Sequence, residues 1–237
     1  MGIAAVWGPP RSGKTTVAID LATALSERGK SVLLISPEAF SELSARLGIQ
    51  IRQNKSLMAA YKNRETLKQI VHKVDDLLFV LAVPFDHDAF GDDLSEELAK
   101  SILTQAKNLF DVVLVDCPSH TDSVLAAWAL SSSDHVLLLS GANSAAPLWN
   151  KAYRKAVEAM EHKTFHICAE VSESFDYHTL LSVLDVTPEA WLPYFPNADM
   201  VQNTKKTLYK TNGKSGKAYT KAVDALCDLL AGKEEEA

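Results

Sequence analysis

Close to the start of the chain, two glycines, a lysine and a threonine have the spacing of a phosphate-binding loop. The stretch Gly8-x-x-x-x-Gly13-Lys14-Thr15 follows the apolar run 3–7 and precedes a helical pattern. Glycines let the backbone turn so that successive N–H groups point at phosphate oxygens, and a helix N-terminus adds its positive dipole end. Lys14 can reach the β- and γ-phosphates, and the Thr15 hydroxyl can ligate Mg²⁺. The same cradle is expected to include Pro9, Pro10, Arg11, Ser12 and Thr16.

A carboxylate is expected to complete the metal site. The run DVVLVD, residues 111–116, reads as a buried strand that ends in Asp116. At the carboxyl end of a strand, Asp116 can hold Mg²⁺ directly or through a water molecule. An acidic residue in that position is common, so this interpretation depends on its pairing with the phosphate-binding loop.

Short apolar runs alternate with helical patterns along the whole chain. We predict strands at 3–7, 31–36, 77–83, 111–116, 135–140, 164–170 and 190–195, and helices at 14–28, 40–47, 56–74, 93–109, 121–131, 147–161, 177–184 and 216–231. This alternation predicts an α/β fold: a doubly wound, mostly parallel sheet of about seven strands with helices on both faces. Ligands of such sheets bind at the carboxyl ends of the strands, where both motifs fall. We expect one nucleotide-binding domain over 1–231 and an acidic, disordered tail over 232–237.

The composition excludes several other classes of protein. No apolar stretch among the 237 residues is long enough to span a bilayer, and the N-terminus lacks the features of an export signal. Three cysteines without metal-ligand spacing favour buried, reduced thiols, and hence a cytoplasmic protein. The net charge of −6 gives no global attraction for nucleic acid or anionic lipid.

The motifs together resemble the MinD/ParA class of P-loop ATPases, over nearly the whole chain. The resemblance is carried by GPPRSGKTT at residues 8–16, VLLIS at 32–36 and DVVLVDCPS at 111–119, and it extends to the closing segment that begins at Trp191. It implies a P-loop NTPase fold, ATP and Mg²⁺ as cofactors, slow hydrolysis, a nucleotide-dependent homodimer and a protein partner that reads the nucleotide state. The uncharged start of the loop is similar to the TadZ/CpaE branch, which serves pilus and secretion assembly.

Two departures from the family pattern bear on catalysis. The family's first loop lysine, which reaches the partner's phosphates, falls on Pro9, which has no charge and no N–H. Arg11 can supply a donor fork from a different position, or it is a solvated loop residue. Where the family has Asp-x-Asp, this chain has Ser36-Pro37-Glu38. Glu38 either orients the attacking water or caps a helix that starts near Phe40.

These departures leave three functions open. With Lys14, Glu38 and Asp116 as catalytic residues, the chain is a slow ATPase switch. Without an effective replacement for the missing lysine, it is a non-hydrolysing, nucleotide-bound scaffold. A small-molecule kinase on the same fold would need an acceptor pocket that the sequence does not reveal.

Two further stretches are candidates for the nucleotide site. In Ser119-His120-Thr121-Asp122, we expect Ser119 or Thr121 to cap the next helix, and the alternative is that His120 senses the γ-phosphate. In the stretch WLPYFPN, the resemblance implies a loop near the nucleotide base, with Pro193 as a cofactor-binding residue. The preference for adenine over guanine rests on the resemblance alone.

Two surface features concern larger partners. Lys205, Lys206, Lys210, Lys214, Lys217 and Lys221 form a basic stretch without an acidic residue. This Lys205–Lys221 patch either binds nonspecific DNA or is a solvated loop and helix face. The C-terminal sequence ends in three glutamates and an alanine, which anionic lipid would repel, so we expect no direct membrane anchor.

Overall fold

The computed structural model describes residues 2–38, 41–63, 66–84, 94–120, 122–204 and 207–232. Its centre is a sheet of eight strands in the order β3-β4-β2-β5-β1-β6-β7-β8, parallel except for the antiparallel edge strand β3. The strands are β1 (Ile3–Trp7), β2 (Val32–Ser36), β3 (His72–Lys73), β4 (Leu78–Ala82), β5 (Val112–Asp116), β6 (His135–Leu139), β7 (Thr164–Ala169) and β8 (Ala190–Leu192). The predicted fold class is confirmed. All seven predicted strands are present, and β3 is an additional short one.

The described helices lie between the strands. They are α1 (Lys14–Glu27), α2 (Leu43–Leu47), α3 (Leu57–Asn63), α4 (Leu67–Ile70), α5 (Glu96–Leu109), α6 (Val124–Ser132), α7 (Ala146–Met160), α8 (Tyr177–Leu184), α9 (Ala198–Asn203) and α10 (Lys214–Ala231), with 3₁₀ turns at Gln53–Lys55 and Glu161–Lys163.

The single helix predicted over 56–74 is wrong. Thr66 has an extended backbone and starts the separate helix α4 with a capping box to Gln69. Val71 is extended again, and the chain continues into β3. The segment therefore contains two short helices and a strand, because each break occurs at a β-branched residue in a β conformation.

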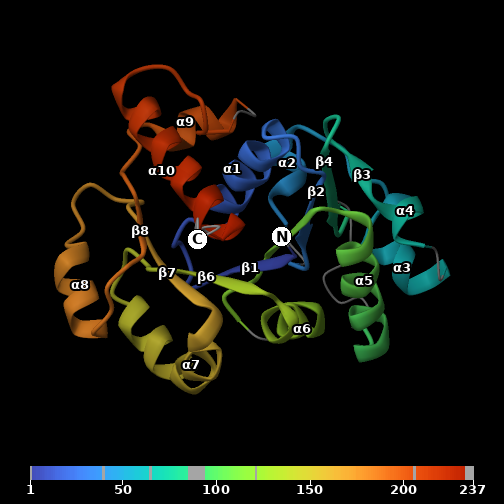
Figure 1. The fold of residues 1–237 in the computed structure, drawn as a ribbon, viewed down its shortest axis with the longest axis horizontal. Helices are drawn as coiled ribbons and strands as arrows, with labels where there is room; N and C mark the ends of the chain where they lie inside the picture. The colour runs from blue at the N-terminus through green and yellow to red at the C-terminus, as the bar shows by residue number, and fades with distance from the viewer. Residues whose placement is uncertain are drawn as a thin grey trace, which may run out of the picture.

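Both faces of the sheet are covered, as its apolar strands require. Alternate residues of each strand point to opposite faces: Ala4 and Val6 of β1 pack in the cluster that contains α1 and α10. Ile3, Ala5 and Trp7 pack in the cluster that contains α5 and α6. Figure 1 shows α1 and α10 on one side of the sheet and α5, α6 and α7 on the other. No helix of the described residues is long and apolar enough to cross a membrane.

The strand order brings three loops together at one edge. β1 lies between β5 and β6, and Val6 is in register with both Asp116 and Leu137. Because the three strands are parallel, the loops that follow them leave the same edge of the sheet. This edge holds the phosphate-binding loop, Asp116 and the start of α7.

Candidate nucleotide-binding site

The loop between β1 and α1 has the backbone shape of a phosphate cradle. Gly8 has φ +151°, and a Cβ there would lie 2.5 Å from the carbonyl oxygen of Leu139 in β6. Gly13 is left-handed, with φ +86°, and is the N-cap of α1. Both positions therefore need glycine, the first for space as well as for conformation. The first turn of α1 begins directly at the cradle, as the sequence predicted.

Lys14 is a half-buried cation at the end of the loop. Its Nζ donates to the carbonyl oxygen of Pro9 at 3.1 Å and to Ser119 Oγ at 2.7 Å. Burial lowers the pKa of Lys14, while the nearby carboxylates of Asp116 and Glu38 act against that shift. An ammonium group held by two neutral oxygens in a desolvated place is well suited to a polyanionic ligand.

Thr15 and Asp116 meet at the same edge, although they are 101 residues apart. The Thr15 hydroxyl donates to Asp116 Oδ2 at 2.8 Å. Asp116 is only 3% exposed, and its Oδ1 has no hydrogen-bond partner among the described residues. Burial raises the pKa of Asp116 to about 7, against the lowering effect of the Thr15 hydroxyl. A buried carboxylate oxygen without a partner is costly unless something else, such as a cation, occupies its free side.

Glu38 stands at the end of β2, close to the same charges. Burial raises its pKa, and the Lys14 ammonium counteracts that rise. Among the described residues, Glu38 does not cap a helix: the N-cap of α2 is Glu42. Helix α2 begins at Leu43, three residues later than predicted, and the Leu43 N–H donates to Ser41 Oγ. Phe40, near which that helix was predicted to start, lies outside the described residues.

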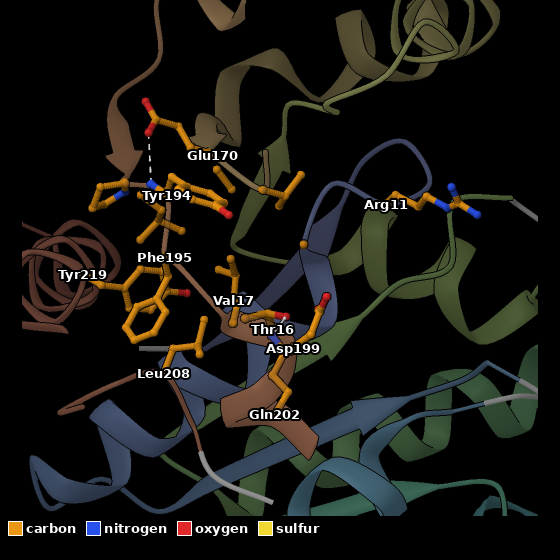
Figure 2. A pocket seen from close by; sticks show the side chains of 16 residues that line it. Arg11, Thr16, Val17, Glu170, Tyr194, Phe195, Asp199, Gln202, Leu208 and Tyr219 are labelled. Atoms are coloured by element: carbon orange, nitrogen blue, oxygen red, sulfur yellow. Dashed lines mark hydrogen bonds between the residues drawn. The ribbon is translucent and has the colours of Figure 1, made fainter. Parts of the chain in front are cut away.

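The residues between the two glycines have different environments. Pro9 packs against Gly141: a Cβ added at Gly141 would come within 2.8 Å of the proline ring. Asn143 Nδ2 donates to the carbonyl oxygen of Pro10 at 3.1 Å. Ser12 is fully buried, and its hydroxyl has no partner among the described residues. Arg11 is left-handed, with φ +59°, and exposed. Arg11 is one of the residues that line the pocket formed in part by the loop, and Figure 2 shows its guanidinium directed away from the other lining side chains.

That pocket, of about 240 Å³, continues from the loop toward the C-terminal part of the chain. Val17 of α1, the β8–α9 loop with Pro193, Tyr194 and Phe195, and Tyr219 of α10 line its apolar end (Figure 2). Its size and apolar walls suit a flat heterocycle. Pro193 thus lines the pocket next to the loop, and its role in binding stays a prediction.

Helices α2 and α9 both contact Thr16, which lines the pocket. The Thr16 hydroxyl accepts from Gln202 Nε2 at 3.2 Å and lies 3.4 Å from both terminal nitrogens of Arg46. Helix α9, which carries Gln202, was not predicted, because its six residues are all at least partly exposed and have no buried apolar face. No pattern in the sequence predicts that Arg46 and Gln202 both contact Thr16.

The predicted capping role of Ser119 is wrong. Helix α6 begins at Val124, and its N-cap is Ser123, whose side chain accepts from the Ala126 N–H at 3.3 Å. Ser119 instead accepts from Lys14 through Oγ and from Trp149 Nε1 through its carbonyl oxygen, the latter at 2.8 Å. Thr121 lies outside the described residues. Sequence reasoning missed Trp149, because its contact spans 30 residues and depends on the packing of α7.

These residues fit a magnesium–nucleotide. Hydroxyl and carboxylate oxygens are ligands that Mg²⁺ prefers. Asp116 Oδ1, which has no hydrogen-bond partner among the described residues, can serve as such a ligand. Within the described residues, no three His, Cys, Asp or Glu side chains converge on a metal position. Mg²⁺ bound here would therefore rely on Thr15, Asp116, water and the phosphates together, as is usual for this ion.

The Lys205–Lys221 patch is described only in part. Lys205 and Lys206 lie outside the described residues, and Lys210 forms an ion pair with Glu27. Lys214, Lys217 and Lys221 are exposed on α10. Of the predicted tail over 232–237, only residue 232 is described.

Comparison with known proteins identifies the class to which this fold and site belong. The family model described as "AAA domain" matches residues 11–152, which is more than half of the chain, and the chain belongs to this family. Together with its relatives and structural neighbours, this makes the chain a MinD/ParA-type P-loop ATPase, as the sequence motifs predicted. The TadZ/CpaE branch stays a prediction.

Individual relatives agree with this class. The chain is 30% identical over 111 residues to the septum site-determining protein MinD of Bacillus subtilis, covering 45% of this chain and 41% of that protein. It is 28% identical over 108 residues to MinD of Synechocystis, with the same coverage. The matched segment thus spans about two fifths of these relatives. The fold of MinD from Pyrococcus horikoshii, solved with Mg-ADP, is similar with a TM-score of 0.77, 22% identity, and coverage of 100% of this chain and 99% of that one.

Proposed function

We propose that this protein is an ATP- and Mg²⁺-binding switch that dimerises on ATP, hydrolyses it slowly and is read by a partner protein. The observation that carries the proposal is the convergence of Lys14, Thr15 and Asp116 at the carboxyl ends of β1 and β5, with one carboxylate oxygen buried and without a hydrogen-bond partner among the described residues. The domain is proposed to comprise residues 1–231.

Each residue of the site has a distinct task. Lys14 exchanges its two neutral oxygen partners for the β- and γ-phosphates, and the backbone N–H groups of residues 11–13 hold the remaining phosphate oxygens, since Pro9 and Pro10 have no N–H to donate. Thr15 and Asp116 hold the metal. When bound, Mg²⁺ neutralises charge that develops on the phosphate oxygens.

Glu38 and Arg11 are proposed to replace the two family residues that this chain lacks. The Glu38 carboxylate lies near Lys14, where it can orient an attacking water. Arg11 points away from its own pocket (Figure 2), and we propose that it reaches the phosphates of a second copy. Its left-handed backbone, unusual for a residue with a side chain, is consistent with a functional constraint.

The test is ATP turnover by the purified protein with Mg²⁺, beside a mass measurement with and without nucleotide. We expect slow phosphate release and an ATP-dependent dimer. Glu38→Gln should retain ATP binding and lose turnover by about 100-fold, since it keeps the shape of the side chain and removes its basicity. Turnover by Glu38→Gln equal to that of the unmodified protein would contradict the role of Glu38.

A second function, a non-hydrolysing scaffold, is favoured by one observation. Pro9 stands where the resemblance implies a loop lysine, and it is buried against Gly141, so the position carries no charge. ATP binding and dimerisation without phosphate release would select this function over the first.

The cellular setting is proposed from the relatives. MinD and ParA proteins in this family take part in septum placement and partition, and we propose a related positioning role in the cytoplasm for this chain. Lys214, Lys217 and Lys221 on α10 are proposed as contacts to nonspecific DNA. Such binding should weaken steeply as salt is added, and salt-independent binding would argue against it.

A further inference from the structure

A second hollow, outside the phosphate cradle, lies beside the pocket described above. It is a groove of about 450 Å³ between the loop after β7 and the loop after β8, here named the aromatic groove. Its walls include the rings of Phe175, Trp191 and Tyr194. Two ring contacts keep these walls in place: Trp191 lies 5.2 Å from His178, and Phe175 lies 4.9 Å from Tyr177. The groove thus offers preformed aromatic faces to a ligand.

The groove is also acidic. Glu170, Glu173 and Asp176 line it, and no lysine or arginine of the described residues does. Hydrogen bonds from the side chain and the N–H of Thr179 lower the pKa of Asp176, so its carboxylate is charged at neutral pH. These carboxylates do not converge as a metal site within the described residues. Aromatic faces beside separated carboxylates suit a guanidinium group, which stacks on rings and donates to carboxylates at the same time.

A third feature, the edge of the sheet, indicates the form of the ligand. β8 carries Trp191, and in the described sheet it pairs only with β7. An edge strand presents unpaired backbone groups, to which an extended peptide can add as a further strand. The groove is also larger than one guanidinium needs. An extended segment along β8 would place alternate side chains toward the aromatic groove.

We propose that the aromatic groove binds an extended, arginine-bearing segment of a partner protein. The groove shares a wall with the nucleotide pocket, since Glu170, Pro193 and Tyr194 line both. The Tyr194 N–H donates to Glu170 Oε2 at 3.0 Å, and the Glu170 N–H donates to the carbonyl oxygen of Leu192 at 2.9 Å. A ligand that moves this wall therefore changes the nucleotide pocket. This coupling, unlike the docking itself, rests on the proposed function.

The docking is tested with the full chain and a fluorescent peptide in which arginine and threonine alternate. We expect it to bind with an affinity that falls with salt, and a matched peptide with glutamate in place of arginine not to bind. Glu173→Gln and Trp191→Leu should each weaken binding by about three- to tenfold. Glu158→Gln, an exposed change on α7, is the control and should have no effect.

Two results would overturn the docking: equal binding of the arginine and glutamate peptides, or unchanged binding by both groove variants. Glu173 is exposed, so its replacement leaves the core intact, and an unfolding curve checks that Trp191→Leu is folded. These outcomes are independent of whether ATP binds.

The coupling is tested by measuring ATP affinity with and without saturating arginine peptide. By linkage, the peptide should change ATP affinity by the same factor by which ATP changes peptide affinity. Peptide binding that leaves ATP affinity unchanged would overturn the coupling. Absence of ATP binding in the free protein would instead count against the proposed function, while peptide binding would still support the groove.

Discussion

At the scale of single residues, the site is a set of polar groups that contact one another at the end of the sheet. Lys14 is bound by two neutral oxygens, Thr15 donates to Asp116, and the second oxygen of Asp116 is buried without a partner among the described residues. Each of these groups is desolvated, which costs free energy in the protein alone. A magnesium–nucleotide would satisfy all of them together.

Lys14→Ala should lower ATP affinity by roughly 100-fold, because charge-assisted contacts to phosphate are among the strongest hydrogen bonds in proteins. Thermal stability should change little, since the substitution also removes a cation whose burial is costly. Calorimetric titration with ATP and Mg²⁺ measures the first quantity. Lys30→Ala, at an exposed position, is the matched control. Retained affinity in Lys14→Ala would contradict the nucleotide site.

A second buried carboxylate, Asp20 of α1, anchors the C-terminal part of the chain. Its oxygens accept from the N–H groups of Leu208 and Tyr209 at 2.9 and 3.2 Å and from the Tyr219 hydroxyl at 2.9 Å. Burial raises the pKa of Asp20 from 3.8 to about 6, although these donors oppose the rise. The folded protein therefore binds a proton at Asp20 more tightly than the unfolded chain does.

This shift predicts a pH dependence of stability with a definite sign. Between pH 4 and pH 6 the folded state holds more protons, so the contribution of Asp20 to the free energy of unfolding falls as pH rises and is constant above that range. Asp20→Asn mimics the protonated form, so its stability relative to the unmodified protein should increase by about 2 kcal/mol from pH 4 to pH 7. Urea unfolding at several pH values measures this. A constant difference would mean that the pKa is not raised.

At the scale of elements, the position of the phosphate loop is fixed by contacts between neighbouring strands. Gly8→Ala would place a Cβ 2.5 Å from the carbonyl oxygen of Leu139, so we expect the loop to move away from β6, with a loss of about 2 kcal/mol in stability and of ATP affinity. Gly29→Ala is the matched control, since it also has a positive φ but nothing within 4 Å of a new Cβ. If both variants lost equal stability and kept ATP affinity, backbone strain alone would explain the result.

The sequence predicted the elements that have a strong local pattern. The strand–loop–helix around Gly8 to Thr15 and the strand that ends in Asp116 were clear, because apolar runs and turn glycines are local signals. The breaks at Thr66 and Val71 were missed, since their extended backbones interrupt an otherwise helical pattern. The role of Ser119 was misassigned, because its partners Lys14 and Trp149 are distant in sequence.

At the scale of the whole molecule, the sheet order places β1 in the centre and gathers the loops after β1, β5 and β6 at one edge. Arg11 stands on this edge, exposed and directed away from its own pocket (Figure 2). Arg11 lines the pocket, but its guanidinium is directed outward and can complete the site of a second copy, if two copies meet through this edge. The resemblance implies a loop lysine at Pro9 that this chain lacks, so we expect Arg11 to supply the cation in the proposed ATP-dependent dimer.

Arg11→Ala should therefore separate binding from assembly. We expect ATP affinity to be nearly unchanged, because the guanidinium points away from the pocket, and the ATP-dependent dimer and its turnover to be lost by at least about tenfold. Arg11→Lys should restore part of both, since it keeps the charge without the planar donor fork. Mass measurement with ATP, phosphate release and calorimetric titration give the three quantities. A large loss of ATP affinity in Arg11→Ala would show that Arg11 serves its own phosphates, and a dimer as stable as that of the unmodified protein would show that another residue holds the two copies together.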